Sequence, residues 1–132
     1  MRLLIIEDDP VNRAYMREIL APHASTVEAA DGRCGLDAFR EALACCRPFD
    51  AVLLDVCMPG MDGHQTLQKL RTLEQDSGLA GDAQAKVIMV SSLNDSGNIS
   101  RAFFDGNALS YLVKPVEAGT LLEELRKFGL IV

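Results

Sequence analysis

Acidic side chains follow two of the apolar runs in this sequence. Glu7, Asp8 and Asp9 come directly after the first run, and Asp55 comes directly after a later one. Carboxylates crowded at one point are unfavourable unless a proton or a cation joins them. Mg2+ is the natural candidate, because it prefers hard oxygen ligands and usually keeps several waters.

A hydroxyl and an ammonium group follow two further apolar runs. Ser91 comes after residues 87–90, and Lys114 comes after residues 111–113. A carboxylate nucleophile, a divalent cation, a hydroxyl and an ammonium around one point suit phosphoryl transfer, in which positioning and charge neutralisation dominate. Asp55 would then become an acyl phosphate. Ser92 is a second small hydroxyl residue, but the register favours Ser91.

These groups must be positioned by short buried strands. Continuous apolar runs of this length are typical of strands that are covered on both faces of a parallel sheet. The weakest run is interrupted by Glu28, and we expect it to be an edge strand. The strands are expected at residues 3–6, 26–30, 51–54, 87–90 and 111–113.

Amphipathic helical patterns separate the strands. Asp9-Pro10 is typical of an N-cap followed by proline at the first helical position, and Asp62 could cap a later helix. The segment 75–85 is expected to be a mobile loop. The apolar stripes are Val11, Tyr15 and Ile19; Leu36, Phe39 and Leu43; Leu67, Leu70 and Leu73; Ile99, Ala102 and Phe103; and Leu121, Leu125 and Phe128.

Five β-α repeats predict an α/β fold with a doubly wound, five-stranded parallel sheet. The common strand order is 2-1-3-4-5, in which the order reverses between strands 1 and 3. Ligands bind at that switch point, outside the carboxyl ends of the strands. Glu7, Asp8 and Asp55 follow the two flanking strands, so they should converge there.

The sequence resembles the receiver domains of two-component response regulators, over nearly its whole length. The matching residues are Glu7-Asp8, the run D-V-C-M-P-G-M-D-G from Asp55 to Gly63, Ser91, and Y-L-V-K-P from Tyr111 to Pro115. The resemblance implies a chemotaxis-regulator-like, flavodoxin-like (βα)5 fold. It also implies a single receiver domain over residues 1–132.

The resemblance implies a role for each matching residue. Asp55 accepts the phosphoryl group and helps to bind Mg2+. Asp8 ligates Mg2+ directly, Glu7 contributes through water, and the backbone carbonyl of Cys57 is a third protein ligand.

On the other side of the phosphoryl group, Lys114 pairs with it and Ser91 binds one of its oxygens. Tyr111 rotates inward behind Ser91, so that phosphorylation is read out on the face made by the expected fourth helix, fifth strand and fifth helix. The resemblance further implies a cis Lys114-Pro115 peptide.

The implied partners are a histidine kinase or histidine phosphotransfer protein and a downstream protein target. The domain is not an enzyme in the ordinary sense, because it catalyses only its own phosphorylation and dephosphorylation. A net charge of −6 argues against a nucleic-acid surface. We expect a cytoplasmic protein without membrane insertion, with an exposed His64 and with buried, reduced cysteines.

Two other functions remain open at this point. A phosphatase of the haloacid dehalogenase type also uses an aspartyl phosphate, but it needs a second Asp two residues after the nucleophile, where this chain has Cys57. A receiver-like module that acts without phosphorylation would lose the acidic pair, the Asp or the Lys, all of which are present here. Nucleotide binding is disfavoured, because no glycine-rich loop follows the first strand.

Overall fold

The computed structural model describes residues 1–56, 58, 60–91 and 110–131. Five parallel strands form one sheet in the order β2-β1-β3-β4-β5, which confirms the predicted fold class, order and edge strand. The strands are β1 (Arg2–Ile6), β2 (Ser25–Ala29), β3 (Ala51–Asp55), β4 (Lys86–Ser91) and β5 (Ser110–Val113).

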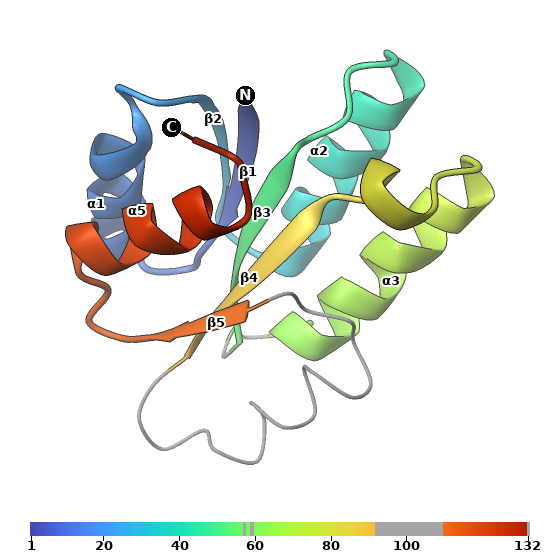
Figure 1. Ribbon diagram of the computed structural model, residues 1–132. Coiled ribbons are helices and arrows are strands. Elements are labelled where there is room, and N and C mark those ends of the chain that lie inside the picture. The colour runs from blue at the N-terminus through green and yellow to red at the C-terminus, as the bar shows by residue number, and fades with distance from the viewer. Residues whose placement is uncertain (57, 59, 92–109, 132) are drawn as a thin grey trace.

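Helices cover both faces of this sheet. In Figure 1, α1 and α5 lie on one side, and α2 and α3 lie on the other. The helices are α1 (Pro10–Leu20), α2 (Gly32–Ala44), α3 (Gly63–Asp76) and α5 (Ala118–Lys127), with a short 3-10 helix η1 (Gly81–Ala83). The helix expected around Ile99, Ala102 and Phe103 lies outside the described residues. Within the described chain, no helix has the length and apolarity needed to span a membrane.

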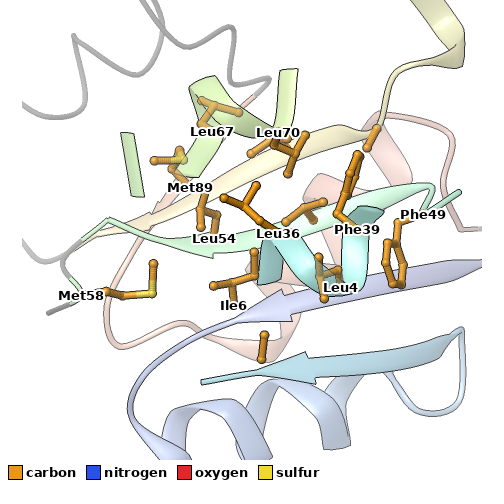
Figure 2. Close-up of a cluster of buried hydrophobic side chains, with 14 of the residues drawn as sticks. Leu4, Ile6, Leu36, Phe39, Phe49, Leu54, Met58, Leu67, Leu70 and Met89 are labelled. Carbon is orange, nitrogen blue, oxygen red and sulfur yellow. The ribbon is translucent and has the colours of Figure 1, made fainter. Parts of the chain in front are cut away.

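Two apolar clusters hold the layers together, one on each face of the sheet. Successive side chains of a strand point to opposite faces, so Leu3 and Ile5 join the α1/α5 cluster while Leu4 and Ile6 join the α2/α3 cluster. All four are completely buried. Figure 2 shows the α2/α3 cluster, in which side chains of β1, β3 and β4 meet those of both helices.

The predicted helix caps are present. The Asp9 carboxylate accepts a hydrogen bond from the Val11 amide at 2.9 Å, and Pro10 occupies the first position of α1. Asp62 and Gln65 form a reciprocal capping box at the start of α3, with distances of 2.8 and 3.1 Å. Both caps fix the direction in which the chain enters the helix after the carboxyl end of a strand.

The predicted apolar face of α1 was wrong by about one residue. Val11 is 74% exposed and Tyr15 is 47% exposed, whereas Met16 and Leu20 are buried against the sheet. Consecutive residues of a helix are about 100° apart, so two neighbouring stripes can both look apolar in the sequence. Packing on the sheet decides between them.

Two further expectations about side chains were wrong. Cys34, Cys45 and Cys46 are exposed rather than buried, because they lie on the outer side or at the end of α2. His64 is 3% exposed, because Gly63 presses the start of α3 against the end of β3.

The expected loop at residues 75–85 is partly helical. Helix α3 continues to Asp76, and η1 takes three more residues. Glu74, which is completely buried, accepts hydrogen bonds of 2.6 Å from the Arg71 guanidinium and from the Ala85 amide. The end of α3 is thereby tied to the start of β4.

Candidate functional site

Three carboxylates meet at the carboxyl ends of β1 and β3, as predicted. One oxygen from each of Glu7, Asp8 and Asp55 lies within 4.8 Å of the others. Glu7 is completely buried and Asp55 is 2% exposed, while Asp8 is open to solvent. The parallel pairing of β1 with β3 places these strand ends side by side.

Lys114 reaches the same point from the end of β5. Its ammonium lies 3.1 Å from Oδ1 of Asp55 and 3.3 Å from Oε1 of Glu7. The Lys114 amide donates to the Ser91 carbonyl at 2.7 Å, which fixes the residue beside the end of β4. The predicted cis peptide between Lys114 and Pro115 is confirmed.

Within the described chain, the carboxylates of the site have an unsatisfied oxygen that could ligate a cation in addition to the Lys114 ammonium. Oε1 of Glu7 accepts from the Asp9 amide at 3.2 Å and from Lys114, but Oε2 is buried and has no hydrogen-bond partner among the described residues. Buried carboxylate oxygens are almost always satisfied in native proteins. An exposed carboxylate, two buried ones and an unsatisfied oxygen make a donor set that fits a hard divalent cation such as Mg2+.

The electrostatics of the site favour the same conclusion. Burial, a hydrogen bond with Asp8 and the charge of Glu7 raise the pKa of Asp55 to about 7, although Lys114 opposes this shift. Burial would lower the pKa of Lys114, but its interactions with Asp55 and Glu7 outweigh that effect and raise it. Excess negative charge is therefore held here at neutral pH, and a cation would relieve it.

Of the other predicted site residues, Ser91 lies at the same edge and Tyr111 lies near it. Asp55 pairs with Val90 in the sheet, so Ser91 is one residue beyond that pair and is buried. Tyr111 is half-buried and packs against the α2/α3 cluster, rather than lying at the acidic point itself. Cys57 lies outside the described residues.

Sequence reasoning missed Arg13, which supports the acidic pair from α1. Its guanidinium donates to the Glu7 carbonyl at 2.8 Å and lies 3.5 Å from the Glu28 carboxylate. Glu28 also pairs with Arg17 at 3.0 Å. The available signal was Glu28 itself, a charged residue within a short strand.

A second missed contact is the close approach of α3 to the backbone of Asp55. A β-carbon at Gly63 would lie 2.5 Å from the Asp55 carbonyl oxygen and 2.8 Å from the Val56 α-carbon. The Gly63 amide donates to the Val56 carbonyl at 2.9 Å. Only glycine allows the helix to begin so near to the end of β3.

Comparison with known proteins gives consistent matches over nearly the whole chain. The family model for the response regulator receiver domain matches residues 3–126. Chemotaxis protein CheY of Bacillus subtilis is 30% identical over 128 residues, which cover 96% of this chain and 95% of CheY. Response regulator MprA of Mycolicibacterium vanbaalenii is 35% identical over 127 residues, which cover 96% of this chain and 49% of MprA.

The fold comparison agrees. The receiver domain of the histidine kinase CKI1 from Arabidopsis thaliana, solved in complex with Mg2+ and BeF3−, has a TM-score of 0.79 at 20% identity, over 96% of this chain and 89% of that one. The chain therefore spans nearly all of CheY but about half of MprA. With the family model matched from residue 3 to residue 126, the chain belongs to the response regulator receiver domain family of two-component signalling proteins.

Proposed function

We propose that residues 1–132 form one receiver domain that accepts a phosphoryl group from a phosphohistidine onto Asp55 and thereby switches the binding of a downstream protein. The observation that carries the proposal is the position of Asp55, buried at the end of β3 between the Lys114 ammonium and the carboxylates of Glu7 and Asp8. A carboxylate, an ammonium group and two further carboxylates thus lie close together, and this arrangement supports phosphoryl transfer to Asp55 with a bound cation.

In the transfer step, one oxygen of Asp55 attacks the phosphorus atom of the donor. A P–O bond forms, the P–N bond to the donor imidazole breaks, and the imidazole leaves with its electron pair. Bound Mg2+ would neutralise charge on the phosphoryl oxygens. Asp8 and Asp55 would hold the ion directly and Glu7 through water, and the predicted Cys57 carbonyl completes the protein ligands.

Lys114 would supply the second positive charge. Its ammonium already lies 3.1 Å from Oδ1 of Asp55, so it can move to a phosphoryl oxygen with little rearrangement. Such preorganised charges lower the barrier because they need no reorganisation during the reaction. The Ser91 hydroxyl would bind a further phosphoryl oxygen.

The switch would then pass to β5 and α5. Tyr111 lies two residues from the Val113 partner of Ser91 in the sheet, and the neighbouring Ser110 hydroxyl donates to Glu124 of α5 at 3.0 Å. A shift of Ser91 and Tyr111 can therefore reach α5 directly. Amide-shift mapping with beryllofluoride should show larger changes on β5 and α5 than on α2, and larger changes on α2 would contradict this route.

Histidine kinases or histidine phosphotransfer proteins are the proposed donors, and a protein is the proposed target. The family is a signalling module rather than a class of turnover enzymes. A cytoplasmic location stays a prediction from the sequence.

The experiment is phosphorylation by a small donor such as acetyl phosphate, followed by intact-mass spectrometry. The native chain should gain one phosphoryl group with Mg2+ and none with EDTA. Asp55→Asn should gain none, and Asp37→Asn, a matched change of an exposed aspartate on α2, should behave as the native chain does.

Two outcomes would overturn the proposal. Labelling of Asp55→Asn to the native level would place the phosphoryl group elsewhere. A native chain that takes up no phosphoryl group from either a small donor or a phosphohistidine protein, but still binds a target, would be a phosphorylation-independent module.

A further inference from the structure

Two adjacent cysteines end helix α2, beside Arg2 at the start of β1 and so at the opposite end of the sheet from the residues of the phosphoryl site. Cys45 is the C-cap of α2 and Cys46 follows it, and both side chains are exposed. Neither thiol has a role in the proposed phosphoryl transfer. Two adjacent exposed thiols differ from a single thiol, because both sulfur atoms can bond to the same metal or metalloid atom.

The backbone holds this pair in a defined turn. The Cys46 amide donates to the Leu43 carbonyl at 3.1 Å, and the Arg47 amide donates to the Ala42 carbonyl at 2.9 Å. These are the two hydrogen bonds of a Schellman motif. Cys46 has a φ of 55° and occupies the position where glycine is usual, since a β-carbon is unfavourable in the left-handed region.

The unfavourable backbone conformation makes the thiol at this position notable. Glycine would close the same turn without strain, yet the chain carries a β-carbon and a thiol there. Because the turn is fixed by its two hydrogen bonds, both sulfur atoms start from anchored α-carbons. Little backbone ordering is then needed when one ligand binds both thiols.

The spacing of the pair favours a bridging atom over a disulfide. Adjacent α-carbons are about 3.8 Å apart. Ordinary disulfides need α-carbons roughly 4.4–6.8 Å apart. A larger atom bonded to both sulfurs relaxes this constraint, and soft thiolate ligands select soft metals and metalloids.

We propose that Cys45 and Cys46 form a bidentate thiol site for a trivalent arsenical. In the binding step, an organoarsenic oxide forms two As–S bonds and loses its As=O oxygen. The two thiol protons leave with that oxygen as one water molecule, so no oxidant or reductant is required.

A groove beside Cys45 indicates which arsenical should bind best. It has a volume of about 310 Å3, and its wall is mixed: Val27, Ala38 and Phe49 are apolar, and Arg2, Glu41 and Arg47 are charged. The Arg2 guanidinium lies 4.7 Å from the centre of the Phe49 ring and closes part of this wall. An aryl group on arsenic would gain contact with the apolar part of this wall, which arsenite lacks the surface to use, so an aryl arsenical should bind more tightly than arsenite.

The test is intact-mass spectrometry of the reduced full chain after incubation with phenylarsine oxide. One adduct should form, should survive a wash with excess 2-mercaptoethanol, and should be released by 2,3-dimercaptopropanol. Cys45→Ser and Cys46→Ser should each lose the wash-resistant adduct, whereas Cys34→Ser should keep it. Cys34 is the matched control because it is an exposed single thiol on the same helix.

A further variant separates chemistry from folding. Cys46→Gly keeps the favoured backbone of the turn and leaves Cys45 in place, so its circular dichroism should match that of the native chain while the wash-resistant adduct is lost. An adduct that survives in Cys46→Gly, that is removed equally well by 2-mercaptoethanol, or that requires Cys34 would overturn the proposal. Phosphorylation of Asp55 is measured separately, so the two proposals can fail independently.

Discussion

Replacing Glu74 by alanine should strongly destabilise the fold. The Glu74 side chain is 1% exposed, and it accepts hydrogen bonds of 2.6 Å from the Arg71 guanidinium and from the Ala85 amide. The substitution leaves the guanidinium, whose side chain is only 13% exposed, without its carboxylate. It also leaves the Ala85 amide buried without that acceptor.

The size of the effect follows from burial. Removing one partner of a buried ion pair costs about 3–5 kcal/mol, because the other charge stays buried without its counter-charge. Arg71 keeps its hydrogen bond to the Ala85 carbonyl at 2.9 Å, but that bond does not supply the lost negative charge. For a chain of this length, the unfolding entropy is roughly 0.28 kcal/mol/K, so the melting temperature should fall by roughly 10–18 °C. The cost is a large part of the total stability of a small domain.

Urea unfolding followed by circular dichroism measures this change, and the chain provides a matched control. Arg40 and Asp37 form an ion pair with the same spacing of three residues, but their side chains are 61% and 66% exposed. Asp37→Ala should change the free energy of unfolding by no more than about 0.5 kcal/mol. If Glu74→Ala lowers the free energy of unfolding no more than Asp37→Ala does, burial does not determine how much the ion pair contributes to stability.

Other substitutions are expected to lower or to raise the free energy of unfolding, depending on the backbone and the space around the residue. Gly63→Ala should lower the free energy of unfolding, measured with urea, by about 1–3 kcal/mol, because the new methyl group would meet the Asp55 backbone. The same displacement of the Asp55 backbone should weaken Mg2+ binding. Gly119→Ala should be neutral or stabilising in the same measurement, because its new methyl group meets nothing within 4 Å. Cys46→Gly should stabilise the fold by about 1 kcal/mol in the same measurement, since it removes a β-carbon from the left-handed region. Without Mg2+, the folded chain binds a proton at Asp55 more tightly than the unfolded chain does, so the free energy of unfolding should fall as pH rises from about 4 to about 7. The affinity for Mg2+, measured by calorimetry, should rise with pH toward 7, because the ion and the proton compete for the Asp55 carboxylate.

Local patterns made much of the fold predictable. Short apolar runs predicted each end of the strands to within one residue, and the acidic residues after β1 and β3 predicted the convergence of Glu7, Asp8 and Asp55. Asp9-Pro10 predicted the start of α1, because capping depends only on neighbouring residues. Each of these inferences uses interactions that are close in sequence or are dictated by the parallel order of the strands.

Contacts between distant elements were not predictable in the same way. Glu28 made the prediction of its strand less clear. Its ion-pair partner, Arg13, could be identified only from the packing of α1 over β1 and β2. The buried face of α1 depended on the same packing, which buries Met16 and leaves Tyr15 exposed. His64 followed a turn rich in glycine, and its burial came from the close approach of α3 to β3.

The most direct test of the central claim is chemical identification of the phosphorylated residue. The chain is phosphorylated with acetyl phosphate and Mg2+ and then reduced with borohydride, which converts an aspartyl phosphate into homoserine. Peptide mass spectrometry should find homoserine at position 55, and a control with EDTA should find none. Homoserine at another acidic residue, or reduction at position 55 that is equal with and without Mg2+, would contradict the proposed site.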